Sequence, residues 1–182
     1  MLICITQHFA GADIVNTGQT LLSIGALLLL GSVIISANRS SLQHGVILQQ
    51  TEIGVYAVSL ATGRIEEATG NAFDECTAPD DSGATDVATS LSQLSSTLGP
   101  ETGETYPDFD DIDDFNNLTT TVYIPGVDSM KVRSTVAYVN PSDPDLLLST
   151  RTWHKKLTVY VTGSVTRDTV RISSIFSYWW FR

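Results

Sequence analysis

The residues with the clearest chemical potential are carboxylates in the segment DFDDIDDF, residues 108–115. Its aspartates are Asp108, Asp110, Asp111, Asp113 and Asp114. Closely spaced carboxylates suit a hard cation such as calcium, which takes roughly six to eight oxygen ligands. The spacing is not that of an EF-hand, because Ile112 occupies the position of a third ligand and no glycine supplies the sharp turn. Two interpretations follow: a calcium site, or a solvated acidic loop whose Phe109, Ile112 and Phe115 pack into the domain.

The two cysteines, Cys4 and Cys76, do not make a disulfide framework, and their spacing to the three histidines does not match a zinc site. If the chain between them is mostly helical, the two residues lie on the order of 100 Å apart. A disulfide allows only about 6 Å between the two Cα atoms, which argues against an intramolecular bridge. Two alternatives stay open: both thiols are free, or Cys4 of one copy is bridged to Cys76 of another.

Motifs of catalysis and nucleotide binding do not occur in the sequence. None of the three lysines follows the glycine-rich turn that a phosphate-binding loop requires. The patterns GxSxG, HExxH and CxxCH are also missing. We therefore expect a protein that is not an enzyme and that holds no cofactor, unless the acidic segment binds calcium.

Two sequons match the pattern of N-linked glycosylation, one at Asn38 and one at Asn117. Asn117 follows the acidic segment and is the better candidate acceptor, because we expect that segment to lie on the surface. The pattern alone does not establish that either residue carries sugar.

Charge is distributed unevenly along the chain. Residues 1–51 carry only two charged side chains, Asp13 and Arg39. Residues 65–130 contain fifteen acids and no base, whereas residues 131–182 contain eight bases and three acids. A net charge of −10 makes nucleic acid an improbable partner. The opposite signs of the two later zones favour association between copies of the chain.

The segment between Asp13 and Arg39 has no charge and is strongly apolar from Leu21 to Ile35. About 25 residues of helix rise roughly 37 Å, which is enough to cross the ~30 Å of hydrocarbon in a membrane. Small residues such as Gly25 and Gly31 interrupt the apolar run and allow helices to approach closely. A helix that is apolar on all sides needs other helices, or lipid, around it.

The remainder of the sequence predicts an α+β fold. Apolar residues at three- and four-residue steps extend the helix, so that we expect one helix over 19–75 after a leader-like segment or N-terminal arm of residues 1–18. Residues 76–118 are rich in Ser, Thr, Asp, Gly and Pro and predict a long acidic surface loop, with a short helix from Asp86 to Leu98. Strand-like runs follow at 119–124, 129–139, 155–163 and 170–180, with a loop at 140–145. We expect these strands to form a small antiparallel β head, residues 119–182, that packs on the helix.

The N-terminal region resembles the type IV pilin superfamily. The resemblance is carried by "GQTLLSIGALLLLGSVII", its amphipathic continuation and the β-rich head, and the stretch "NTGQTLL…NRS…AVSLATGRIEEATGNAFDE" is similar to pilin-like proteins of the Bacteroidota and related bacteria. It covers the first 75 residues, and the rest only in architecture. The resemblance implies a subunit that waits in the inner membrane and then enters a filament on the cell surface with the help of a pilus assembly machinery.

These observations lead us to expect a structural subunit of an extracellular filament, with other copies of the chain as its partners. We expect the polymerisation interface to comprise Leu21, Leu22, Ile24, Gly25, Leu28, Leu29, Gly31, Ile34 and Ile35. Asp13 and Arg39 flank this run and are candidates for ion pairing between subunits in a medium of low dielectric constant. Adhesion, motility, DNA uptake and secretion are not distinguished by the sequence.

Three alternative functions are compatible with the sequence. A secreted binding module would lose the apolar segment as a signal sequence, which predicts a mature N-terminus near Asn38. A pseudopilin of a secretion machine would have the same fold but form only a short assembly. A single-pass membrane-anchored surface protein, with or without calcium, would leave the apolar helix in lipid.

Overall fold

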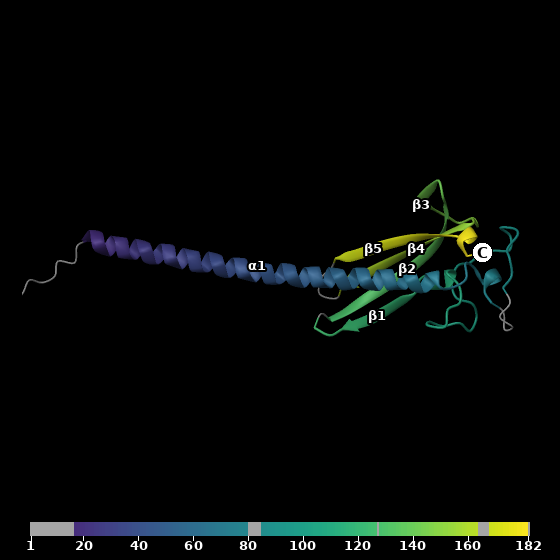
Figure 1. Ribbon diagram of the computed structural model, residues 1–182, viewed down its shortest axis with the longest axis horizontal. Helices are drawn as coiled ribbons and strands as arrows, with labels where there is room; N and C mark the ends of the chain where they lie inside the picture. The colour runs from purple at the N-terminus through teal and green to yellow at the C-terminus, as the bar shows by residue number, and fades with distance from the viewer. Residues whose placement is uncertain (1–16, 80–84, 127, 164–167, 182) are drawn as a thin grey trace, which may run out of the picture. The chain divides into compact units, whose positions relative to one another are not determined.

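The computed structural model describes residues 17–79, 85–126, 128–163 and 168–181. It contains one long helix, α1 (Thr17–Thr69), and a five-stranded antiparallel sheet, which confirms the predicted α+β fold (Figure 1). The chain divides into two compact units between Leu48 and Gln49, inside the helix. The first unit contains the N-terminal part of α1. The second contains the rest of α1 and all the strands, and is called the head below.

Helix α1 has 53 residues and ends at Thr69, earlier than the predicted limit at residue 75. The end coincides with Gly70, whose N–H bonds to a carbonyl only three residues earlier, at 3.1 Å. Glycine weakens helix continuation, and this tighter hydrogen bond is typical of a last turn. The chain then pairs with the acidic segment, because the N–H of Ala72 donates to the carbonyl of Asp110 at 2.8 Å. A tertiary contact therefore replaces the last predicted turns of the helix.

The sheet has the order β1-β2-β4-β5, and β3 pairs with the end of β2. Its strands are β1 (Thr119–Ile124), β2 (Asp128–Asn140), β3 (Asp143–Leu148), β4 (His154–Gly163) and β5 (Thr169–Ser177). Strands β1 and β3 share one edge of β2, while β4 occupies the other edge. Strand β3 was not predicted, because its sequence begins in a segment whose prolines and aspartates favour a loop. Strand β5 ends at Ser177, and Tyr178–Trp180 form a short 3-10 helix instead of the predicted strand end.

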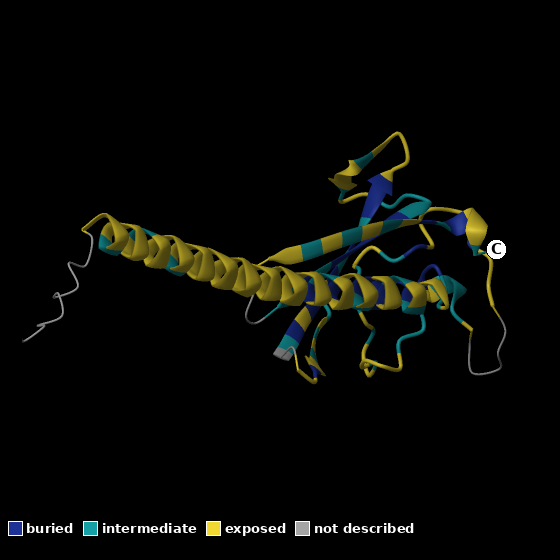
Figure 2. Cartoon of the chain, turned by 60° about the vertical axis from the view of Figure 1, so that its left-hand side comes forward, coloured by how far each residue is buried: buried dark blue, intermediate teal, exposed yellow. Residues whose placement is uncertain are grey.

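The core of the head lies between the sheet and the second half of α1. Strands β2 and β4 contribute alternate apolar side chains to this core. Figure 2 colours the buried residues of the chain dark blue. The helix contributes mainly small residues at helical spacing: Ile53, Ala57, Ala61 and Ala68. Alanine side chains let a helix lie close to a sheet, and this stripe marks the face of α1 that the head buries.

The loop segment from 85 to 118 has no α-helix, so the prediction of a helix from Asp86 to Leu98 is wrong. The side chain of Gln93 instead accepts the backbone N–H groups of Thr89 and Ser90, at 2.7 and 2.9 Å. Side-chain hydrogen bonds of this local kind compete with helix formation. Leu94 is nevertheless buried, as an apolar anchor of a turn.

Candidate functional site

The N-terminal part of α1 carries apolar side chains that no described residue covers. Seven of the leucines and isoleucines expected in the polymerisation interface are between 54% and 77% exposed, and most of this helix is coloured as exposed in Figure 2. They are Leu21, Leu22, Ile24, Leu28, Leu29, Ile34 and Ile35. The helix is long and apolar enough to cross a membrane, and none of its most apolar window is buried. A folded soluble domain rarely exposes a continuous apolar surface of this size.

The two serine hydroxyls within residues 21–35 bond to carbonyls of the same helix. The hydroxyl of Ser23 donates to the carbonyl of Gln19 at 3.0 Å, and that of Ser32 donates to the carbonyl of Leu29 at 2.8 Å. These bonds leave the serines without an unmet donor when water is excluded. A Cβ added at Gly25 or Gly31 would meet no atom within 4 Å. The glycines are therefore not required by packing inside this chain.

Arg39 is exposed and is the one charged side chain of α1 before Glu52. Its candidate partner Asp13 lies outside the described residues, as does Cys4. Pairing between Asp13 and Arg39 of different copies therefore stays a prediction.

The acidic segment forms a second unusual region, in which charged side chains are buried. Asp111, Asp113 and Asp114 are completely buried, so the interpretation as a solvated loop is wrong for these three residues. Phe115 and Ile112 are buried as that interpretation predicted. The segment is attached to the edge of β2 between β1 and β3, where Ser134 and Val136 hydrogen-bond to residues 115–118. Filling this gap in the sheet edge brings the aspartates into the head.

Lys155, at the start of β4, joins the helix end, the acidic segment and the sheet. Its ammonium group contacts the carboxylates of Asp74, at 2.8 Å, and Asp113, and donates to the carbonyl of Phe73 at 2.7 Å. All the side chains of these ion pairs are fully buried. The ammonium also lies 4.8 Å from the centre of the Phe73 ring. We call Lys155, Asp74 and Asp113 the Lys155 network.

Asp74 accepts several hydrogen bonds in addition to its ion pair with Lys155. The backbone N–H of Ser95 donates to both its oxygens at 3.0 Å, and the hydroxyl of Tyr138 donates to Oδ2 at 3.2 Å. Burial favours the protonated form of Asp74, but the charge of Lys155 and these hydrogen bonds outweigh it and lower its pKa. The network is therefore ionised at Asp74 and holds a loop, a helix end and two strands together.

Asp111 and Asp114 stabilise the short 3-10 helix at Asp113–Phe115. Oδ1 of Asp111 accepts the N–H groups of Asp113 and Asp114 at 2.6 and 3.2 Å, and Oδ2 of Asp114 accepts those of Asp110 and Asp111 at 3.3 and 3.2 Å. Burial, together with the charge of Asp113, raises the pKa of Asp111 to about 10. Burial also raises the pKa of Asp114 to about 6. The folded head therefore favours the protonated form of Asp111.

Beside this network, five carboxylates gather in a separate group, which we call the carboxylate cluster. Its members are Glu75, Glu101, Glu104, Asp110 and Asp114. One oxygen from each of Glu75, Glu101 and Glu104 lies within 4.8 Å of the others, and the same holds for Glu104, Asp110 and Asp114. Burial, then the hydrogen bond to Glu104, raises the pKa of Glu101 to about 8. Among the described residues, no ion pair involves any of these five carboxylates.

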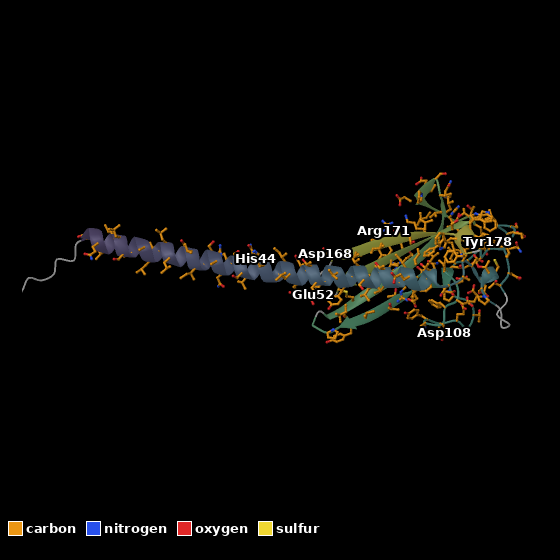
Figure 3. The ribbon with its side chains drawn as sticks, in the orientation of Figure 1. His44, Glu52, Asp108, Asp168, Arg171 and Tyr178 are labelled. Carbon is orange, nitrogen blue, oxygen red and sulfur yellow. The ribbon has the colours of Figure 1, made fainter. Side chains whose placement is uncertain are left out.

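The structure therefore changes the composition of the expected calcium site. Asp110 and Asp114 belong to the carboxylate cluster, whereas Asp113 pairs with Lys155 and Asp111 binds backbone N–H groups. Asp108 is exposed and belongs to neither group of three (Figure 3). The five aspartates do not converge on a single point, as the sequence interpretation required.

The structure also describes the surroundings of Cys76, the candidate for a disulfide between copies, and of Asn117, the candidate for glycosylation. Cys76 is a free, half-buried thiol, and burial raises its pKa to about 11, which keeps it protonated and slows disulfide exchange. Asn117 is exposed in a left-handed conformation, with φ of 61°. The bridge between copies and the glycosylation both stay predictions.

The sequence interpretation missed Lys155, Asp74 and the three glutamates of the carboxylate cluster. One signal was present: Lys155 has the same parity along its strand as Leu157 and Val159, so it belongs to the buried face. A lysine at such a position needs carboxylate partners. The glutamates follow no recognisable spacing, because Glu75 lies far along the chain from the other two.

No family model, no curated protein and no solved structure matches the chain.

Proposed function

We propose that this chain is the structural subunit of an extracellular, pilus-like filament, whose core consists of copies of the apolar segment of α1. The observation that supports this most is the uncovered apolar surface of residues 21–35. The resemblance of the N-terminal region to pilins, which includes the same residues, is a further reason. The proposal assigns no catalytic activity to the chain.

Burial of this surface provides the driving force. A fully buried leucine or isoleucine side chain contributes about 1.5–3 kcal/mol relative to an exposed one. Seven such side chains in the expected interface are more than half exposed in the isolated chain. Part of this gain offsets the cost of association, and each further helix that covers the segment adds to it. The segment therefore has sufficient surface for polymerisation.

Features other than hydrophobicity suit packing of the apolar segment of α1 against copies of the same helix after assembly. A Cβ placed on Gly25 or Gly31 would have no neighbour within 4 Å, so the surface at both glycines is available for close approach by another helix. The self-bonded hydroxyls of Ser23 and Ser32 can enter such an interface without an unmet hydrogen bond. Before assembly, the same properties suit residence in a membrane, for which the helix is long and apolar enough.

Electron microscopy of material sheared from the cell surface, combined with N-terminal sequencing of the purified subunit, tests the proposal. We expect long fibres. The N-terminus of their subunit should lie at residue 19 or earlier, so that residues 21–35 are retained. Short assemblies that stay attached to the envelope would favour a pseudopilin. Recovery of the chain only in the membrane fraction, with no sedimenting fibres, would favour a permanent single-pass anchor and contradict the proposal.

A further inference from the structure

We propose that the carboxylate cluster is a calcium-binding site that stabilises the head. The ion is held by Glu104, Asp110 and Asp114, and Glu104 also belongs to a second group of three with Glu75 and Glu101. This site lies in the head alone and does not depend on the proposed function of the apolar helix.

The carboxylate oxygens of the cluster lie close enough to one another to share a cation. In each group of three, the candidate ligand oxygens lie within 4.8 Å of one another. Two oxygens bound to one calcium at about 2.4 Å are separated by no more than roughly 4.8 Å. Carboxylates that only face water are free to turn apart and reduce their repulsion. The described oxygens therefore lie at separations that one cation can bridge.

Buried oxygens without partners provide the independent observation. Asp114 is completely buried, and its Oδ1 has no hydrogen-bond partner, although Oδ2 accepts two backbone N–H groups. Asp110 Oδ1 and Glu101 Oε2 are also buried atoms without a partner. An unmet buried carboxylate oxygen is costly, and a directly bound cation removes that cost. Three members of the cluster thus each have an oxygen that lacks a donor and is withdrawn from water.

The neighbouring Lys155 network does not supply this missing charge. The lysine contacts Asp74 and Asp113, which lie outside the cluster. Arg64 pairs with Glu67 at 3.0 Å and donates to the hydroxyl of Thr120. Lys155 and Arg64, like the buried Lys156 that pairs with Asp145, are therefore engaged outside the cluster.

The ligand chemistry selects calcium among common cations. All the candidate ligands are carboxylates, with no histidine and only oxygen donors in either group of three. Such donors suit hard cations, and zinc or copper would prefer nitrogen or sulfur. A site with several protein carboxylates from separate loops fits the large and flexible coordination shell of calcium. Magnesium retains more of its waters and is usually held by only one or two carboxylates.

The test is thermal unfolding of the full chain in detergent micelles, first stripped with a chelator and then supplied with calcium chloride. A ligand present at about 100 times its dissociation constant raises the unfolding midpoint of a domain of this size by at least about 5 °C. We expect this shift with calcium, and a shift several-fold smaller with the same concentration of magnesium chloride. Equal shifts with the two cations would overturn the assignment to calcium.

A pair of variants separates specific binding from general screening of negative charge. Glu104→Gln removes the residue common to both groups of three and keeps an oxygen that can accept the N–H of Glu101. Asp108→Asn removes the same charge from an exposed neighbouring position. We expect Glu104→Gln to lose the calcium shift while the chelated protein stays as stable as wild type or more so, because like-charge repulsion is reduced. Asp108→Asn should keep the shift.

Isothermal titration of the same samples provides a second readout that does not require unfolding. We expect calcium affinity to fall at least tenfold in Glu104→Gln and less than twofold in Asp108→Asn. Unchanged binding in Glu104→Gln, similar losses in both variants, or no calcium binding to the wild-type chain would each overturn the proposed site.

Discussion

The apolar segment of α1 and the Lys155 network contrast in how they place chemically unusual residues. In the first, leucines and isoleucines are more than half exposed; in the second, a lysine and two aspartates are fully buried. Each arrangement is unfavourable unless another group compensates for it. In the network the compensating groups belong to the same chain. For the apolar segment, no described residue provides them.

The two regions therefore have different roles: the Lys155 network stabilises the head, and we propose that the apolar segment of α1 drives assembly. In the Lys155 network, the ammonium of Lys155 pairs with two carboxylates of the same chain, and a carbonyl and a hydroxyl of the head add further hydrogen bonds. Other buried carboxylate oxygens of the head have no partner among the described residues. The apolar segment satisfies its backbone and serine hydroxyls, but not its hydrophobic surface. We therefore expect mutations in the network to affect folding, and mutations in the segment to affect association.

Replacement of Lys155 by methionine has the largest expected effect. It leaves Asp74 and Asp113 buried without their cation, which costs about 3–5 kcal/mol of unfolding free energy. Chemical denaturation of the full chain in detergent, followed by circular dichroism, measures this loss. Lys156→Met is the matched control, because Lys156 is also buried but its partner Asp145 is 91% exposed and stays solvated when the lysine is removed. Equal stability of Lys155→Met and wild type would show that the network does not hold the head together.

Introduction of a charge at Leu28 should affect assembly without unfolding the head. A lysine in the middle of an apolar helix costs about 2.5–3.5 kcal/mol per subunit when it enters an apolar environment. We expect Leu28→Lys to abolish sedimenting fibres and to leave the unfolding midpoint of the head unchanged. Leu147→Lys is the control, because Leu147 on β3 is 61% exposed, close to the 69% of Leu28. If Leu28→Lys still forms fibres, Leu28 does not belong to the polymerisation interface.

Above about pH 4, we expect the titration of Asp111 to make the free energy of unfolding depend on pH. Because burial and the charge of Asp113 raise its pKa to about 10, the folded chain holds a proton that the unfolded chain releases near pH 4. The contribution of Asp111 to the free energy of unfolding therefore decreases as the pH rises from about 4 to about 10. Asp74, with its lowered pKa, acts in the opposite direction and loses its contribution only as the pH falls below about 4.

In a buffer with chelator, we therefore expect a higher unfolding midpoint at about pH 5.5 than at about pH 8. Asp111→Asn imitates the protonated carboxyl and keeps an oxygen for the N–H groups of Asp113 and Asp114. This variant should reduce the dependence on pH and be at least as stable as wild type at about pH 8. An unchanged slope in the variant would assign the pH dependence to other groups.

Substitution of Asn117 has the smallest expected effect. Its φ of 61° lies in the left-handed region, where a β-branched residue is disfavoured. Asn117→Val should lower the unfolding free energy by about 1–2 kcal/mol, while Asn117→Gly should leave it within about 0.5 kcal/mol. Thermal unfolding of the two variants measures the difference. Similar midpoints would show that the segment adopts another conformation in solution.

The periodic parts of the fold were predictable, and the parts defined by tertiary contacts were not. Strand β1 agrees with its predicted limits because its alternating pattern is bounded by clear turn residues. The end of α1 was misjudged, because Ala72 pairs with Asp110, a contact that has no local signature. The predicted helix from Asp86 failed for a related reason, since Ser95 binds Asp74 from the turn.

The candidate sites show the same limit. The apolar segment is evident from composition alone, since it needs no knowledge of what surrounds it. The carboxylates of the acidic segment were found, but their roles depend on Lys155, which is forty-two residues from Asp113 and lies on another element. Glu101 and Glu104 join Asp110 and Asp114 only through the folding of the loop. Spacing along the chain therefore identified the ligand type but not the ligand set.

Analytical ultracentrifugation of the purified full chain after removal of detergent, without added lipid, tests the central claim most directly. If the apolar segment is covered by copies of itself, the chain with residues 21–35 intact should form fast-sedimenting fibres in which the head remains folded. A stable, soluble monomer under the same conditions would contradict the account, because it would show that this surface needs no partner.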